Sequence, residues 1–351
     1  MSEKVVIMLS GLIPESEQKR FEFLDEYGVE YEYIEEYRDD DKPLLERHLK
    51  LEKEGPDAFT FSDEYLQKLQ SADILISFYS PVPSVAFEEG RAKTVIILRS
   101  GVENINLPRA TAAGVRVINA PGRLAAPVAE FTVGLMISEM KNIARGHARV
   151  MNHDWNTKFS NSKIVYNIKG RNIGIVGCGA VGRRVARAMK AMDANVLVYD
   201  PYCAAETLKA EGYEPVSLEE LCERSDVISV HYRLTDETEG MIGKNHFELM
   251  KPTAYLINTA RAGLIDEQAL IDALKEHRIA GAGLDVFHEE PLPEDSPLLS
   301  MDNVTLTPHL AGTCTDLMDL TFDVVLVCMR KYFETGEWTN VVNARELADK
   351  K

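Results

Sequence analysis

A glycine-rich stretch in the middle of the chain decides the fold: residues 172–182 read NIGIVGCGAVG. The stretch begins as an apolar run typical of a buried strand, and apolar residues at helical spacing follow it. Between the two, Gly177, Gly179 and Gly182 form the pattern GxGxxG. In a strand–turn–helix unit the first glycine permits the tight turn, the second lets the backbone approach a pyrophosphate, and the third lets helix and strand pack closely. This context predicts a dinucleotide-binding unit.

The cofactor that this unit prefers is predicted from the residues around it. Ala180 and Val181 begin the helix, whose free N–H groups can hold phosphates. Asp200 ends the next apolar run, where an acidic side chain can accept hydrogen bonds from a ribose diol and would repel a 2′-phosphate. A strand-ending Asp that only caps a turn is the alternative, and the glycine loop before it favours the cofactor interpretation. The sequence therefore predicts NAD rather than NADP.

Apolar runs alternate with helical patterns through most of the chain, which predicts an α/β protein with parallel sheets. Predicted strands of the first third are residues 5–9, 73–78, 94–98 and 115–118. From Lys169 onward the predicted strands are residues 172–176, 195–199, 226–231, 254–258, 281–286 and 303–307. Six βα-linked strands are the count for a doubly wound dinucleotide domain.

Charge and periodicity predict the structure of the segments between these strands. Residues 37–57 are strongly charged, and we expect them to form a solvated excursion. Residues 127–150 keep helical spacing and predict one long helix that joins the two α/β regions. A last helix is expected from about Asp316 to Glu334, ended by Gly336.

Composition argues against several classes of partner. The formal charge of the 351 residues is −17, from 39 Lys+Arg and 56 Asp+Glu, which disfavours nucleic acid and anionic membrane surfaces as partners. The 5 cysteines are dispersed without a CxxC pair or a Cys/His cluster, so we expect reduced thiols and no metal site. No apolar stretch has the length of a membrane-spanning helix. We therefore expect a cytoplasmic protein.

Three polar signals follow the last three predicted strands. Arg261 comes after residues 254–258, Glu290 after the next strand, and His309 after the last. In open α/β sheets ligands bind outside the carboxyl ends of the strands, so the three side chains can converge on one crevice. Arg suits a carboxylate, His donates a proton near neutral pH, and a neighbouring carboxylate orients the imidazole and favours its protonated form. This set predicts hydride transfer at the carbon next to a carboxylate.

Each of these residues could also have a purely structural role. A lone His after a strand is usually structural, and a lone Arg usually forms a salt bridge. His288 and Glu289 are better explained as a solvated turn than as functional residues. Three functional residue types at three consecutive strand ends favour a catalytic site.

The chain resembles the D-isomer-specific 2-hydroxyacid dehydrogenases, a family that includes D-3-phosphoglycerate dehydrogenases and glyoxylate/hydroxypyruvate reductases. The likeness runs from about Val95 to Asn343. It rests on RSGVENIN at 99–106, NAPG at 119–122, VAE at 128–130 and the segments 258–270, 285–291 and 307–312.

The resemblance implies a role for each matching residue. By that likeness Arg261 binds the substrate carboxylate and carbonyl, His309 is the acid/base, and Glu290 is its partner. Further residues implied to contact the cofactor are His231, Thr259, Ala260 and Asp285, the last of them near the nicotinamide. The residues implied to meet the substrate carboxylate through their backbone are Ser100, Gly101 and Val102.

The resemblance also implies the domain organisation. A Rossmann NAD-binding domain over residues 122–314 would be inserted in a flavodoxin-like substrate-binding domain, split into residues 1–121 and 315–351. The likeness further implies a homodimer built through the cofactor domain, with residues 146–155 as an arm. The implied partner is a small 2-hydroxy or 2-oxo acid.

The chain departs from the family pattern in places. Ala262 stands where the family usually has Gly, and Asn106 where it usually has Asp. HYRL at 231–234 replaces a more apolar, Pro-containing stretch. It contains Arg233, for which a surface salt bridge is the expected role, as for Arg99 and Arg123. If two of these three arginines pointed into the cleft, the substrate would carry a second anionic or polyhydroxyl end.

Alternatives remain open at this point. The family includes corepressors that sense NAD by binding it, and an acidic chain without extra tails makes that class less favoured. Formate dehydrogenases pair the His with Gln, so Glu290 argues against them. D-3-phosphoglycerate dehydrogenase specifically stays a possible identity, because no readable motif selects the substrate side chain.

Overall fold

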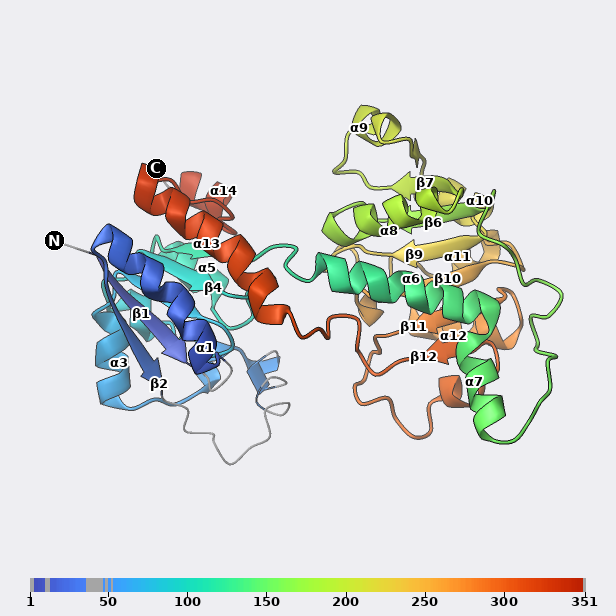
Figure 1. The fold of residues 1–351 in the computed structure, drawn as a ribbon, viewed down its shortest axis with the longest axis horizontal. Coiled ribbons are helices and arrows are strands. Elements are labelled where there is room, and N and C mark those ends of the chain that lie inside the picture. The colour runs from blue at the N-terminus through green and yellow to red at the C-terminus, as the bar shows by residue number, and fades with distance from the viewer. Residues whose placement is uncertain (1–2, 10–12, 36–46, 48–49, 52, 350–351) are drawn as a thin grey trace. The chain divides into compact units, whose positions relative to one another are not determined.

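The structure is a computed structural model that describes residues 3–9, 13–35, 47, 50–51 and 53–349 (Figure 1). Much of the charged excursion expected over residues 37–57 lies outside the described residues. The chain divides into two compact units. Unit 1 comprises Met1–Arg123 with Thr315–Lys351, and unit 2 comprises Leu124–Cys314.

Unit 1 is built on a parallel sheet of five strands in the order β2-β1-β3-β4-β5. The strands are β1 (Lys4–Leu9), β2 (Glu30–Glu35), β3 (Ile74–Ser77), β4 (Thr94–Ile97) and β5 (Arg116–Ile118). This is the flavodoxin-like order, with neighbouring strands in chain sequence except for the reversal at β1. The predicted fold class is confirmed for this unit.

Helices and 3-10 helices (η) of unit 1 connect these strands. They are α1 (Glu15–Gln18), η1 (Lys19–Tyr27), η2 (Pro56–Ala58), α3 (Asp63–Gln70), α4 (Val85–Glu88), α5 (Leu107–Ala112), α13 (Leu317–Thr335) and α14 (Ala344–Ala348). Helix α13 returns from the far end of the sequence to this core, where Phe322 and Phe21 meet edge to face at 5.1 Å. It ends at Gly336, whose φ of 76° is the left-handed conformation that a C-terminal cap favours.

Unit 2 contains a parallel sheet of seven strands in the order β12-β11-β10-β9-β6-β7-β8. The strands are β6 (Asn172–Val176), β7 (Asn195–Tyr199), β8 (Glu214–Pro215), β9 (Val227–Val230), β10 (Tyr255–Asn258), β11 (Gly281–Leu284) and β12 (Val304–Leu306). From β8 to β11 this is the doubly wound dinucleotide-binding order 3-2-1-4-5-6, and β12 extends it. The predicted count of six strands is wrong, because the two-residue edge strand β8 is too short to leave a pattern.

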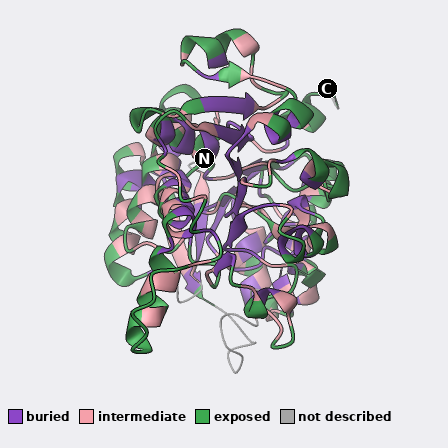
Figure 2. Cartoon of the chain, turned by 90° about the vertical axis from the view of Figure 1, so that its right-hand side faces the viewer, coloured by how far each residue is buried: buried purple, intermediate pink, exposed green. Residues whose placement is uncertain are grey.

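Helices cover the sheet of unit 2, leaving its strands buried and the outer helix faces exposed (Figure 2). They are α6 (Ala125–Lys141), α7 (Ile143–Met151), α8 (Ala180–Ala191), α9 (Ala205–Ala210), α10 (Leu218–Arg224), α11 (Lys244–Leu249), η3 (Ala262–Leu264), α12 (Glu267–Lys275) and η4 (Pro297–Ser300). Across the described part of the chain, no helix is long and apolar enough to cross a bilayer.

The single helix predicted over residues 127–150 is wrong. Helix α6 ends at Lys141, and Asn142 takes a left-handed φ of 58° before α7 begins (Figure 1). Asn tolerates this conformation better than most residues. Its side chain is buried and donates to Asn161 at 2.7 Å, which holds the turn in place.

Candidate active site

The glycine loop of unit 2 leads from β6 to α8. Gly177 has a φ of +89°, and a Cβ built there would lie 2.9 Å from the backbone of His231. A Cβ on Gly182 would lie 2.0 Å from the carbonyl oxygen of Gly177. Gly179, at the N-cap of α8, has no atom within 4 Å of such a Cβ. A side chain at Gly177 or Gly182 would therefore clash with the protein's own backbone. Gly179 instead leaves open space beside a helix N-terminus, and that space fits a phosphate group.

Asp200 follows β7 and points back to the glycine loop. Its Oδ2 accepts a hydrogen bond from the backbone N–H of Cys178 at 2.7 Å, and its Oδ1 accepts one from the N–H of Tyr202 at 2.9 Å. The turn-capping role weighed for this residue is therefore present. Each carboxylate oxygen keeps a further lone pair, so the ribose contact remains compatible with this geometry.

Three tyrosines gather at the carboxyl ends of β7 and β9, a feature that the sequence reading missed. Tyr232 stacks with Tyr199, and Tyr202 tilts toward it; both pairs have ring centroids 6.3 Å apart. The adjacent His231 contacts Ser229 through Nε2 at 2.8 Å, and burial lowers its pKa to about 3. This imidazole is therefore neutral at physiological pH, a polar group rather than a charge beside the loop.

Arg233 follows this cluster and is exposed. The prediction that Arg233 forms a salt bridge is wrong, since no carboxylate of the described residues pairs with its guanidinium. Its backbone carbonyl accepts a hydrogen bond from the Thr238 hydroxyl at 2.8 Å, which shapes the loop.

The loop after β10 carries Arg261. Asn258 holds this loop, because its side chain accepts from the N–H of Ala260 at 3.0 Å and donates to the carbonyl of Arg261 at 2.9 Å. The buried Thr259 shares a hydrogen bond of 2.6 Å with the Thr132 hydroxyl of α6. Arg261 donates from Nη1 to the carbonyl of Ala260 at 2.7 Å, and its side chain is exposed. The guanidinium keeps other N–H groups for a ligand.

Glu290 and His309 come together although 19 positions separate them. The Nδ1 of His309 lies 2.8 Å from Oε2 of Glu290, whose Oε1 accepts from the N–H of Phe287 at 3.0 Å. The His309 side chain is 49% exposed and that of Glu290 34%, so a ligand can reach them. With Nδ1 directed at the carboxylate, Nε2 is the ring nitrogen left to exchange a proton with a ligand.

Asp285 holds the turn that carries His309. Its carboxylate is fully buried and accepts from the Thr307 hydroxyl at 2.6 Å, the N–H of Leu310 at 2.9 Å and the N–H of Ala311 at 2.8 Å. His309 itself has a left-handed φ of 53°. Asp285 thus secures an unfavourable backbone conformation, a role that the sequence did not suggest.

The loop predicted to bind the substrate carboxylate lies in unit 1, after β4. Ser100 donates from Oγ to the carbonyl of Ala120 at 3.0 Å and accepts from the Asn119 side chain at 2.6 Å. A Cβ on Gly101 would lie 2.3 Å from the Glu103 carboxylate. The loop is therefore fixed by its own contacts, and Val102, which follows, packs against the core of the unit.

Two arginines beside this loop have partners within unit 1. Arg99 pairs with Glu103 at 3.6 Å and lies 4.5 Å above the ring of Tyr79. Arg123 is only 6% exposed and donates to the Thr321 hydroxyl at 2.9 Å. Neither guanidinium is an exposed cation of the kind that a second anionic substrate group would meet.

The five cysteines are free, and among the described residues no group of His, Cys, Asp and Glu could hold a metal ion. Cys178 lies in the glycine loop, where burial raises the pKa of its thiol to about 11. The thiolate is the reactive form of cysteine, so this residue is a small buried filler rather than a nucleophile.

Comparison with known proteins places this arrangement in a family. A family model described as "D-isomer specific 2-hydroxyacid dehydrogenase, NAD binding domain" matches residues 133–311, which confirms the prediction of an NAD-binding domain. A D-3-phosphoglycerate dehydrogenase of Methanocaldococcus jannaschii is 37% identical over 82% of the chain. A glyoxylate reductase of Korarchaeum cryptofilum is 37% identical over 76% of the chain. The chain spans 55% of the first relative and 82% of the second.

A solved structure of D-lactate dehydrogenase with NAD+ from Lactobacillus jensenii is also similar. It has a TM-score of 0.73 and 26% identity, and the likeness covers 97% of this chain and 99% of that one. The match to the NAD-binding domain, the two curated relatives and this shared architecture agree. The chain belongs to the D-isomer specific 2-hydroxyacid dehydrogenase family.

Proposed function

We propose that this protein is an NAD-dependent dehydrogenase that acts at C2 of a D-2-hydroxy acid or of the corresponding 2-oxo acid. Unit 2 is the NAD-binding domain in this proposal, and unit 1 is the substrate-binding domain. The observation that carries the proposal is the pairing of His309 with Glu290 at 2.8 Å on the two loops that follow β11 and β12. Arg261 follows the neighbouring strand β10, so a proton donor and a cation lie at one edge of the sheet.

The residues divide the chemistry between them. NAD supplies or accepts the hydride when it is bound, and the glycine loop with the N-terminus of α8 would hold its phosphates. Arg261 binds the substrate carboxylate through the N–H groups that Ala260 does not occupy. In reduction, Nε2 of His309 donates a proton to the developing alkoxide, and Glu290 stabilises the imidazolium beforehand. In oxidation, the same nitrogen removes the hydroxyl proton.

The remaining predicted contacts belong to the same proposal. The backbone N–H groups of Ser100, Gly101 and Val102 bind the substrate carboxylate, and their fixed loop supports that role. The predicted cofactor contacts are His231, Thr259, Ala260, Asp285 and Asp200.

The test is NADH oxidation by the purified protein with a panel of 2-oxo acids, with NADPH in parallel. The panel contains glyoxylate, pyruvate, hydroxypyruvate, branched members and 3-phosphohydroxypyruvate. Turnover that is lost in His309→Gln supports the proposal. Tight NADH binding without turnover of any member would contradict it and favour the corepressor-like function, in which NAD is sensed rather than used.

The same panel separates the substrate classes of the two named relatives. A preference for 3-phosphohydroxypyruvate would support a D-3-phosphoglycerate dehydrogenase, and a preference for glyoxylate or hydroxypyruvate would support a reductase. The internal partners of Arg99 and Arg123 weigh against a second anionic site in unit 1. We therefore expect the small, unphosphorylated acids to be preferred.

We also propose that the protein is a homodimer that uses the arm over residues 146–155. Helix α7 buries none of its own side chains, and Val150, Met151 and Trp155 are 51%, 66% and 84% exposed. Apolar side chains gathered in this way are typical of a protein interface. Sedimentation should therefore report a dimer, and Met151→Glu with Trp155→Glu should give a monomer. An unchanged mass in the double variant would contradict this interface.

A further inference from the structure

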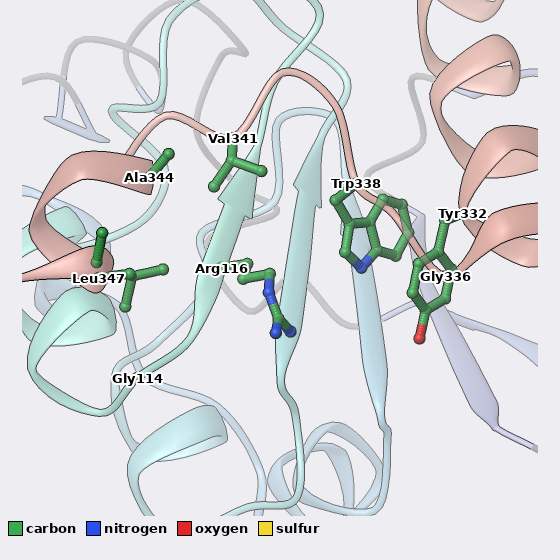
Figure 3. A pocket seen from close by; sticks show the side chains of 9 residues that line it. Gly114, Arg116, Tyr332, Gly336, Trp338, Val341, Ala344 and Leu347 are labelled. Atoms are coloured by element: carbon green, nitrogen blue, oxygen red, sulfur yellow. The ribbon is translucent and has the colours of Figure 1, made fainter. Parts of the chain in front are cut away.

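A pocket of about 630 Å³ opens in unit 1, outside the residues assigned to the proposed reaction (Figure 3). The edge strand β5 forms one side, through Arg116, and the end of α13 forms another, through Tyr332. The connection to α14 and that helix complete it with Trp338, Val341 and Leu347. Its volume is in the range of small-molecule sites.

The pocket is closed on one side by a segment that is firmly held. Residues 340–342 run antiparallel to β5, with Val342 donating to Val117 at 2.8 Å. The buried Asn343 accepts from the N–H of Val117 at 3.1 Å and donates to the carbonyl of Val115 at 2.9 Å. The wall is thus a built part of the fold, not a loose end that lies near the sheet.

Two hydrogen-bond donors on residues that line this pocket lack a partner among the described residues. The guanidinium of Arg116 makes no ion pair or hydrogen bond with any residue that the structure describes. The indole Nε1 of Trp338 is buried and likewise lacks an acceptor among the described residues. Figure 3 shows the indole nitrogen on the side of the ring that faces Arg116. A buried N–H without an acceptor is costly, and the indole N–H usually finds a partner when it is buried.

The rest of the lining is apolar and flat. The rings of Tyr332 and Trp338 are stacked 4.0 Å apart with an interplanar angle of 9°. The Tyr332 hydroxyl is already used, because it donates to Glu3 at 2.6 Å. Val341 and Leu347 line the pocket beside this aromatic wall. A matching ligand would therefore have a flat apolar body, with an anionic group at the Arg116 end.

The position of the pocket separates it from the proposed reaction. Arg116 pairs with Thr94, the first residue of β4, whereas the Ser100 loop follows the last residue of that strand. In a parallel sheet these are opposite ends of the strands. The small polar acids proposed as substrates also lack the apolar body that this lining fits. A ligand here would be distinct from the substrate.

We propose that this pocket binds a small organic carboxylate with an aromatic body. The carboxylate accepts hydrogen bonds from the exposed Arg116 guanidinium. The aromatic body lies against the apolar wall. Arg is suited to a carboxylate because its planar N–H groups match the two oxygens. In a chain of net charge −17, the Arg116 guanidinium, which has no carboxylate partner among the described residues, is a local positive charge that would attract such an anion.

The experiment uses Trp338 as its own reporter. The chain has 2 tryptophans, so Trp155→Phe in the full chain leaves Trp338 as the single tryptophan, whose emission can be excited apart from that of the tyrosines. We would titrate this protein with 3-phenylpropionate and follow the emission. The comparison ligands are 3-phenylpropionamide, which lacks the charge, and propionate, which lacks the ring. We expect a saturable change with 3-phenylpropionate and at least about tenfold weaker binding of both comparison ligands.

Variants separate the proposed contacts. Arg116→Met should weaken binding of 3-phenylpropionate by about tenfold or more, whereas Arg345→Met, an exposed arginine of α14, should leave it unchanged. Equal binding of the acid and its amide, unchanged binding in Arg116→Met, or no saturable response would each overturn the proposal.

Discussion

The carboxylate of Asp285 holds the backbone that follows His309. It accepts hydrogen bonds from the N–H groups of Leu310 and Ala311 at 2.9 and 2.8 Å, and it is fully buried. His309 sits in the left-handed region with a φ of 53°, which is unfavourable for a non-glycine residue. The direction of the imidazole therefore depends on a residue that holds the backbone on either side of it, through Thr307, Leu310 and Ala311. A residue of this kind is a positioning residue for the proposed acid/base.

Asp285→Asn should loosen this turn. The amide group places N–H donors against backbone N–H groups, which we expect to cost roughly 1–3 kcal/mol of unfolding free energy. The kcat should fall more than about tenfold, because the position of the imidazole becomes variable. NADH affinity, measured by fluorescence, should stay nearly unchanged. Asp272→Asn, at an exposed carboxylate of α12, is the matched control. Weakened NADH binding with normal kcat at saturation would instead support the predicted nicotinamide contact.

His309→Gln removes the proposed proton donor and keeps a polar side chain of similar reach. We expect kcat to fall by about a hundredfold or more, which is the scale of general acid–base catalysis. The binding of NADH should persist. His288→Gln is the matched control, because the hydrogen bond of His288 goes to the backbone carbonyl of Ile265, at 3.2 Å, and not to a carboxylate. Comparable losses of kcat in both variants would show that His309 has no special role.

The glycine loop gives a pair of substitutions with opposite consequences. Gly177→Ala places a Cβ 2.9 Å from the His231 backbone at a φ of +89°, so it should destabilise unit 2 by roughly 1–3 kcal/mol. Gly179→Ala meets no atom within 4 Å and should leave the unfolding midpoint unchanged. It should still weaken NADH binding by about tenfold or more, because the methyl group occupies the space beside the helix N-terminus. Normal NADH affinity in a folded Gly179→Ala protein would contradict the proposed phosphate site.

Asp200 should decide between NAD and NADP. Asp200→Ser keeps an acceptor near Cys178 but removes the charge that would repel a 2′-phosphate. We expect the ratio of kcat/KM for NADH to that for NADPH to fall by about tenfold or more. Asp193→Asn, an exposed carboxylate of the same unit, should leave the ratio unchanged. A wild-type protein that already prefers NADPH would refute the assignment before any variant is made.

The sequence predicted the strands that are buried on both faces. Such strands are continuous apolar runs, as residues 172–176 show, and their pattern is visible without knowledge of their neighbours. β2 escaped prediction because its sequence EYEYIE buries only Ile34 and reads as a charged segment. It forms a strand because the edge of the sheet offers β1 as a partner. Strand pairing of that kind is a property of the folded chain.

In the candidate site, too, some features could be predicted from the local sequence and others depend on tertiary structure. Residue types at the strand ends predicted Arg261, Glu290 and His309, and the structure brings the last two within hydrogen-bond distance. Their catalytic roles stay predictions. The partners of Asp285 could not be predicted, since three donors meet its carboxylate from a loop more than 20 residues away. Charge and spacing identify reactive groups, but the hydrogen bonds that hold them depend on tertiary structure.

Glu139 in α6 is a carboxyl group inside the core of unit 2, and no sequence pattern singled it out. It is fully buried, accepts a hydrogen bond from the Thr305 hydroxyl at 2.6 Å and pairs with Arg145, which also donates to the carbonyl of Asp302 at 2.6 Å. Burial raises the pKa of Glu139 from 4.5 to about 7, although Arg145 opposes the shift. The native state therefore retains this proton at a pH where the unfolded chain has lost it.

This proton should make stability depend on pH in a defined window. Because the pKa is higher in the folded state, the stabilisation is complete below pH 4.5 and is lost as the pH rises to about 7. His231 acts in the opposite sense, since its pKa is lowered to about 3. Both the wild type and Glu139→Gln contain His231, so its contribution cancels when the urea unfolding free energy of one protein is subtracted from that of the other. We expect the unfolding free energy of the wild type to fall relative to that of Glu139→Gln as the pH rises from 4.5 to about 7. Above that range the difference between the two proteins should be constant. A pH-independent difference would mean that Arg145 keeps Glu139 ionised in both states.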